Sequence, residues 1–204
     1  MISIIDYGLG NVGAFANVYK RLNIPTVIVR QPEELEGATH VILPGVGAFD
    51  HAMELLDASG LRPVLSSLVG SARAKLLGVC VGMQMLADSS EEGEAPGLGW
   101  VPGRVRAFAG LESWEGLPLP HMGWNDVHAT GPGPLLAGME SDARFYFLHS
   151  YFFEAASEDH IAARASYGSG FACMVRRDHV FGVQFHPEKS HHWGVNLLKN
   201  FAAV

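Results

Sequence analysis

The chain has 204 residues but only two cysteines, Cys80 and Cys173. Two cysteines cannot build the disulfide framework of a small secreted domain, so we expect a reduced, cytoplasmic location. Basic residues are also few, because 14 Lys and Arg stand against 21 Asp and Glu, for a net charge of −7. This balance argues against a nucleic-acid partner or an anionic membrane surface. No apolar run approaches the roughly 18 residues of a membrane-spanning helix.

What remains is the composition of a compact globular protein, with 48% hydrophobic and 17% charged residues. Residues 1–6 lack the basic region and cleavage site of a signal peptide, so we expect them to form a first strand. The sequence contains no linker, internal repeat or low-complexity tract. We therefore expect a single domain that spans residues 1–204.

Strand and helix patterns alternate in the first half of the chain. The pattern predicts strands at 2–6, 26–29 and 40–43 and helices at 12–22, 48–60 and 61–70, with at most a short helix at 32–35. Asn11 is a plausible N-cap of the first helix. This alternation predicts an α/β fold with a mostly parallel central sheet flanked by helices.

The alternation ends at about residue 104. An acidic, glycine-rich stretch at 88–99 is interpreted as a surface loop. Beyond it, short β runs are separated by Pro and Gly turns, and an apolar stripe of Trp193, Leu197 and Phe201 predicts a closing helix. We therefore expect the C-terminal half to add an antiparallel or mixed β portion to the same core. The runs are 125–128, 145–149, 161–165, 172–176 and 180–185.

The stretch 76–86 is typical of a nucleophile elbow. A strand-like run meets a helix-like run at Cys80, and Gly78 and Gly82 supply the small neighbours that a sharp strand-to-helix turn requires. A helix N-terminus also favours the thiolate form of a cysteine. Taken alone, the segment fits a buried core cysteine equally well.

A second cluster, His186-Pro187-Glu188, follows the last predicted strand. Pro187 favours extended backbone at His186, and residues two apart in extended chain project to the same side. Glu188 could then orient His186, as an activated thiol requires. A surface His and Glu beside a helix N-terminus is the alternative. Both clusters fall at carboxyl ends of predicted parallel strands, where sites in α/β sheets lie.

Together these residues resemble the triad, or class I, glutamine amidotransferases. Gly78-Val-Cys-Val-Gly-Met-Gln84 and His186-Pro-Glu188 carry the general resemblance. A narrower resemblance, to the glutaminase subunits of imidazole glycerol phosphate synthases, runs from the first strand to the closing helix. It rests on Pro44-Gly-Val-Gly47, Pro120-His-Met-Gly-Trp-Asn125, Tyr146-Phe-Leu-His-Ser-Tyr151 and Gln184-Phe-His-Pro-Glu-Lys-Ser190.

The resemblance implies that Cys80 attacks the side-chain amide of glutamine, while His186 transfers protons and Glu188 orients His186. A thioester forms and water hydrolyses it to glutamate. The resemblance also implies an oxyanion hole made by the backbone N–H of Val81 and an N–H of the Gly45–Gly47 loop, from Val46 or Gly47. The residues implied in glutamine binding are Gly45, Gln84, His149, Ser150 and Tyr151.

The family passes ammonia to a (βα)8-barrel cyclase subunit, so the resemblance implies a heterodimer in histidine biosynthesis. Its interface and ammonia path would include Asn11, Trp124, Asn125, Tyr146 and Lys189. No cofactor and no metal are expected. The adjacent His191 and His192 do not form a zinc site, because neighbouring side chains on a helix point about 100° apart.

Three alternatives remain open at this point. One is a glutaminase subunit for another acceptor, in the anthranilate, aminodeoxychorismate or pyridoxal phosphate pathways, although the Pro-Gly-Val-Gly loop argues against these. Another is a non-catalytic regulatory module of the same fold, which would tolerate the loss of Cys80, His186 or Glu188. The third is a cysteine peptidase on this scaffold, which Gln84 disfavours.

Overall fold

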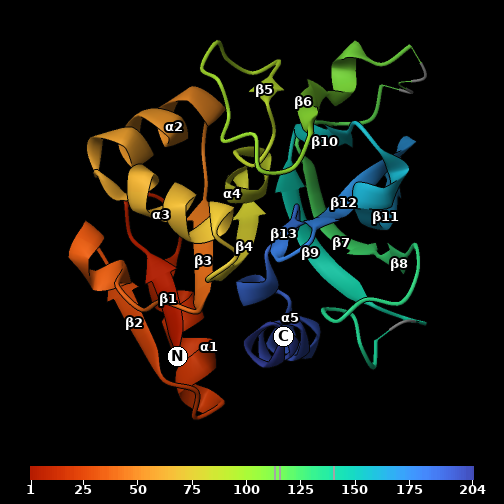
Figure 1. Ribbon diagram of the computed structural model, residues 1–204. Helices are drawn as coiled ribbons and strands as arrows, with labels where there is room; N and C mark the ends of the chain where they lie inside the picture. The colour runs from red at the N-terminus through yellow and green to blue at the C-terminus, as the bar shows by residue number, and fades with distance from the viewer. Residues whose placement is uncertain (113, 115, 140) are drawn as a thin grey trace.

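A large mixed β-sheet dominates the computed structural model of the chain, which describes residues 1–112, 114, 116–139 and 141–204 (Figure 1). Its first half consists of neighbouring parallel strands, as the alternating pattern predicted. Across the sheet these strands are β2 (Thr26–Val29), β1 (Ile2–Ile5), β3 (His40–Gly45), β4 (Lys75–Cys80) and β13 (Val180–Val183).

The second half of the sheet continues from β13 through antiparallel pairs, so the expected mixed β portion is confirmed. Its strands are β12 (Ser169–Arg177), β10 (Tyr151–Ala155), β6 (Gly103–Ala107), β5 (Ser89–Ser90), β11 (Ile161–Tyr167) and β8 (His128–Ala129). The strands β7 (His121–Asp126) and β9 (Arg144–His149) differ from the expectation, because they form a separate antiparallel pair.

The helices begin and end close to the predicted positions. Helix α1 (Val12–Arg21) buries Phe15, Val18 and Tyr19, and the Asn11 side chain accepts the Ala14 N–H at 3.2 Å, which confirms the N-cap. The other α-helices are α2 (Phe49–Ala58), α3 (Leu61–Gly70), α4 (Val81–Gln84) and α5 (His191–Ala203). The 3₁₀-helices are η1 (Pro32–Leu35), η2 (Phe108–Gly110), η3 (Glu158–His160) and η4 (Pro187–Lys189).

The helices pack in pairs against one hydrophobic core. Helices α1 and α5 lie together, joined by the Tyr19 hydroxyl, which donates to the Leu198 carbonyl at 3.0 Å, while α2 lies beside α3 (Figure 1). The buried apolar side chains of both halves of the chain belong to the same cluster, and each large one contributes about 1.5–3 kcal/mol by leaving water. Within the described residues, none of the helices has the length and apolar character needed to cross a membrane.

The carboxyl ends of β3, β4 and β13 meet at one edge of the sheet. Gly45 at the end of β3 is in register with Cys80 at the end of β4, and Val183 of β13 is in register with Val79. The segments that follow these strands therefore begin side by side. This is the edge where open α/β sheets bind ligands.

Candidate active site

The predicted elbow at Cys80 is confirmed by its backbone. Cys80 ends β4 with φ +55° and ψ −113°, a backbone conformation that residues other than glycine rarely adopt. Val81 is the first residue of α4. The two glycines are needed for space. A Cβ on Gly82 would lie 2.0 Å from the Leu43 carbonyl oxygen, and one on Gly78 would lie 2.5 Å from the Gly82 oxygen.

Cys80 opens onto a cavity of about 280 Å³ at the carboxyl edge of the sheet. Most of the site residues expected from the sequence line this cavity together, although Gly45 and Glu188 do not lie on its wall. The expected residues that line it are Val46, Gly47, Cys80, Val81, Gln84, His149, Ser150, Tyr151, His186 and Lys189. Glu92, Pro120 and Leu148 also line it and were not predicted.

His186 and Glu188 face each other, as predicted from their spacing. Glu188 is the orienting carboxylate that lies behind the cavity wall, and its Oε1 is 2.9 Å from Nδ1 of His186, with both side chains only 3% exposed. Burial lowers the pKa of His186, but the interactions with Cys80 and Glu188 outweigh it and raise the pKa to about 10. An imidazolium and a thiolate in the same cavity stabilise each other.

Ser190 fixes the loop that carries this pair, a role that its sequence context did not indicate. The fully buried Ser190 hydroxyl donates to the His186 carbonyl at 2.6 Å and accepts the Tyr146 N–H at 3.0 Å. The His186 N–H in turn donates to the Tyr146 carbonyl at 2.9 Å. Strand β9 is thereby joined to the loop between β13 and α5. These bonds fix the backbone that carries the imidazole of His186.

The loop that follows β3 lies opposite the elbow. Gly45 is paired with Cys80 across the sheet, and Val46 and Gly47 continue into the cavity wall. The Tyr7 hydroxyl donates to the Pro44 carbonyl at 2.8 Å and holds the start of this loop. Gly47 has φ +89°, and Val46 is 40% exposed. The base of the loop is anchored while its tip reaches solvent.

Glu92 is the acidic member of the cavity wall, and it also holds the first turn of α2. Its Oε2 accepts the Phe49 N–H at 2.9 Å, while the Asp50 carboxylate accepts the N–H groups of Glu94 and Ala95 at 2.9 and 3.0 Å. Burial raises the pKa of Glu92, against the opposing effect of the Phe49 N–H. Because α2 directly follows the 44–48 loop, these bonds link that loop to Glu92.

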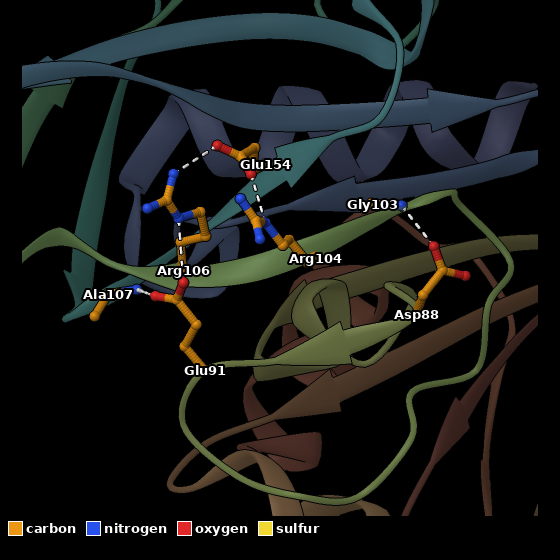
Figure 2. A network of polar contacts seen from close by, with 7 residues as sticks. All are labelled: Asp88, Glu91, Gly103, Arg104, Arg106, Ala107 and Glu154. Atoms are coloured by element: carbon orange, nitrogen blue, oxygen red, sulfur yellow. Dashed lines mark hydrogen bonds and ion pairs between the residues drawn. The ribbon is translucent and has the colours of Figure 1, made fainter. Parts of the chain in front are cut away.

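The segment that carries Glu92 is not the simple surface loop that its composition suggested. It includes β5, which pairs with β6, and Figure 2 shows the polar contacts that hold it there. Glu91 accepts the Ala107 N–H at 2.9 Å and binds Arg106, whose guanidinium also binds Glu154 of β10. Ion pairs at the surface contribute little to stability, so their main effect is to fix the position of the segment.

A buried pair of histidines supports the wall from the other side. Nδ1 of His149 lies 2.7 Å from the Tyr151 carbonyl, which can only accept, so the proton is on Nδ1 and Nε2 is an acceptor. Nδ1 of His121 then donates to that Nε2 at 3.0 Å, and the Asn125 amide donates to His121 and to the Ser166 carbonyl. The side chains of His149 and Asn125, expected to meet substrate and partner, are therefore engaged internally.

These two histidines make the fold sensitive to acid. Burial lowers the pKa of His121 to about 4 and that of His149 to about 3. Between these values and about 6.5, the unfolded chain binds protons that the folded chain does not, so the free energy of unfolding falls as the pH falls. Each histidine contributes a slope of up to about 1.4 kcal/mol per pH unit in that window.

We expect His121→Phe to reduce the slope of the free energy of unfolding against pH between pH 4.5 and 6, by the contribution of about one proton, or about 1.4 kcal/mol per pH unit. The phenyl ring keeps the stacking of His121 on Phe147 and Tyr167, at centroid distances of 4.9 and 4.2 Å, but cannot be protonated. Urea unfolding at several pH values measures the slope. A slope equal to that of the wild type would contradict the assignment, whatever the change in absolute stability.

Trp124 and Asn125, two of the residues expected at a partner interface, belong to β7. Trp124 is 42% and Met122 65% exposed, and Trp124 stacks on the exposed His191 at 5.3 Å. Tyr146 is half-buried beside Trp124, whereas Asn11 and Lys189 are exposed. A partner role for these residues stays a prediction. Within the described part of the chain, no three His, Cys, Asp or Glu side chains gather as metal ligands, and His192 is exposed like His191.

Known proteins are similar to this chain along its whole length. The profile of the family described as Glutamine amidotransferase class-I matches residues 3–204. A protein of Bdellovibrio bacteriovorus named imidazole glycerol phosphate synthase subunit HisH is 60% identical over 204 residues, which cover 100% of both chains. A relative with the same name in Leptospira interrogans is 52% identical over 100% of both chains, and one of Pseudomonas aeruginosa named imidazole glycerol phosphate synthase subunit HisH 2 is 45% identical, also over 100% of both.

Solved structures support the fold. A crystal structure described as a glutamine amidotransferase superposes with a TM-score of 0.77 at 24% identity, covering 99% of this chain and 97% of that one. A glutamine amidotransferase of Thermotoga maritima superposes with a TM-score of 0.64 at 15% identity, covering 99% and 82%. At these identities the likeness concerns the architecture alone.

Proposed function

This chain belongs to the class-I glutamine amidotransferases, and we propose that it is the glutaminase subunit of an imidazole glycerol phosphate synthase. It hydrolyses glutamine to glutamate and ammonia for histidine biosynthesis. The observation that carries the proposal is the convergence of Cys80, His186 and Glu188 on one cavity, in a chain similar to named subunits over its full length. With its two free, buried cysteines, the subunit is assigned to the cytoplasm.

The reaction begins with attack of the Cys80 sulfur on the side-chain amide carbon of glutamine. His186, held as an imidazolium by Glu188 and the thiolate, gives its proton to the departing ammonia. The resulting thioester is hydrolysed by a water that His186 deprotonates. Glu188 keeps Nδ1 of the ring occupied at 2.9 Å, which leaves Nε2 for both proton transfers.

Backbone N–H groups stabilise the oxyanion of each tetrahedral intermediate. Val81 contributes the N–H that follows the nucleophile, and Val46 or Gly47 contributes one from the loop opposite. Each donor of this kind lowers a barrier by about 3 kcal/mol. The anchor of Tyr7 on Pro44 and the bond from Phe49 to Glu92 hold the two ends of this loop.

The rest of the cavity wall binds the amino-acid end of glutamine. Glu92 provides a carboxylate for the α-ammonium group, and the backbone around Ser150 and Tyr151 provides polar groups for the carboxylate end. Gly45 and Gln84 support the wall beside the nucleophile. Neither His149 nor Gln84 has to leave its internal hydrogen bonds for this arrangement.

The partner is a cyclase subunit of the (βα)8-barrel type, which receives the ammonia. Its docking surface is the exposed apolar region of Met122 and Trp124, beside Tyr146, and Lys189 lies on the cavity wall. Large exposed apolar and aromatic side chains are typical anchors of protein interfaces. Asn11 lies at the same carboxyl edge of the sheet, after β1.

We expect the isolated chain to hydrolyse glutamine slowly and the ligand-loaded cyclase complex to do so roughly tenfold faster or more, which is a barrier change of about 1.4 kcal/mol. The reason is the exposed tip of the oxyanion loop, Val46 and Gly47, whose orientation a partner can bias. Steady-state glutamate release, with and without the cyclase subunit of the same organism, measures the effect.

Full activity of the isolated chain would contradict this dependence on the partner. Purification of the chain from its source cell, followed by mass spectrometry of what accompanies it, identifies the acceptor pathway. Recovery of an anthranilate, aminodeoxychorismate or pyridoxal phosphate synthase component in place of a cyclase would overturn the proposed function.

A further inference from the structure

The mechanism above leaves one polar side chain beside the nucleophile without a role. Gln184 follows β13 directly, is fully buried, and places its Nε2 3.8 Å from the Cys80 sulfur. A buried amide is costly unless its groups are hydrogen-bonded, so its presence beside the thiol calls for a reason. An apolar side chain of the same size would fill the space without that cost.

The direction of the Gln184 amide follows from its neighbours. The Tyr151 carbonyl can only accept, so the Gln84 group that lies 3.2 Å from it must be its NH2. The same Gln84 nitrogen lies 3.1 Å from Gln184, which must therefore present its carbonyl oxygen there. The NH2 end of Gln184 is left facing the Cys80 sulfur. The Tyr151 carbonyl therefore determines the orientation of Gln84, and Gln84 determines that of Gln184.

That carbonyl is itself held firmly. It accepts Nδ1–H of His149 at 2.7 Å in addition to the Gln84 amide, and His149 is fixed by His121. The backbone N–H of Gln184 donates to the Cys173 carbonyl at 2.9 Å. The backbone of Gln184 and the oxygen of its side chain are thus positioned by groups that do not depend on substrate.

We propose that Gln184 is a further catalytic residue, whose side-chain N–H donates to the Cys80 sulfur, stabilises its thiolate form and fixes its direction of attack. The proposal rests on Cys80 being the nucleophile of the proposed function. A hydrogen bond to a charged acceptor is stronger than one between neutral groups, and it is strengthened further in a buried site. His186 supplies the charge on one side of the sulfur, and Gln184 supplies a neutral donor on another.

Alkylation of Cys80 by iodoacetamide in the purified complex tests this proposal without glutamine. In Gln184→Met, which keeps the side-chain length but has no N–H, we expect alkylation at pH 7.5 to slow about tenfold and its pH profile to move to higher pH. Peptide mapping separates Cys80 from Cys173, which is fully buried. Circular dichroism and thermal melting report whether the variant is folded.

Gln84→Met is the matched comparison, because it removes the bond to Gln184, while a thiolate, which only accepts hydrogen bonds, still favours the N–H end of the Gln184 amide beside it. It should raise the KM for glutamine and slow alkylation by less than threefold. Equal slowing in both variants would overturn the proposal, since Gln184 would then act only by holding Gln84. Alkylation of Gln184→Met at the rate of the wild type would overturn it as well.

If Gln184→Met does not fold, Gln184→Glu serves in its place. Glutamate keeps the volume and the acceptor for Gln84 but offers the sulfur an oxygen instead of an N–H. Slower alkylation than in the wild type at pH 8 supports the proposal, and an unchanged rate contradicts it. Failure of the proposed function gives a different result. In that case Cys80 of the wild-type complex is alkylated at the normal rate, but the complex does not hydrolyse glutamine.

Discussion

Replacement of Cys80 by alanine is expected to lower glutamine hydrolysis by about 10⁴-fold or more, to the background of the assay. No other group in the cavity can form the thioester, because the only other cysteine, Cys173, is buried in β12 and does not line the cavity. Glutamate release by the complex, followed with coupled detection, measures the loss. Turnover near that of the wild type would contradict the assignment of the nucleophile.

The same substitution should leave the fold and partner binding intact. Alanine keeps the Cβ and the positive φ of residue 80, so the free energy of unfolding should change by about 1 kcal/mol or less. Cys173→Ala is the matched control. It removes a thiol of equal size from the core, so it lowers stability but leaves glutamine hydrolysis close to the wild-type rate.

Gly82→Ala is expected to lower the free energy of unfolding by about 3 kcal/mol or more. The added Cβ would lie 2.0 Å from the Leu43 carbonyl oxygen. The position of this Cβ is fixed by the backbone of residue 82, and the oxygen belongs to the backbone of β3, so no side-chain rotation can relieve the clash. Helix α4 would have to move away from β3, carrying the Val81 N–H with it. Chemical denaturation and glutaminase assays should therefore both show large losses.

Gly13→Ala provides the contrast for this experiment. Gly13 is an exposed residue of α1, and a Cβ added there has nothing within 4 Å. Alanine is favoured over glycine in a helix by about 1 kcal/mol, so this variant should be slightly more stable than the wild type. A Gly82→Ala protein that melts at the same temperature as Gly13→Ala would refute the steric explanation.

The parts of the site that could be predicted are those that short stretches of sequence determine. The elbow at Cys80 needs glycines at fixed offsets, and the pairing of His186 with Glu188 follows from extended backbone around Pro187. The N-cap at Asn11 was predicted for the same reason, whereas the parallel sheet was predicted from the alternation of strands and helices along the first half of the chain.

The parts that were missed depend on which strands become neighbours. Gln184 contacts Cys80 because β13 pairs with β4. Ser190 contacts Tyr146 because β9 packs against the loop between β13 and α5. Glu92 was assigned to a surface loop, because acidic and glycine-rich composition carries no sign that its carboxylate caps α2. Periodicity reports which side of an element is buried, but not what it is buried against.

The positive φ of Cys80 also bears on whether this chain is a working enzyme. Glycine adopts such a backbone at no steric cost, whereas cysteine there carries about 1 kcal/mol or more of strain. In a copy that served only as a regulatory module, mutation to glycine would improve folding, and selection for stability alone would remove the thiol. A cysteine at such a position is a sign of selection for its chemistry, maintained against the preference of the fold.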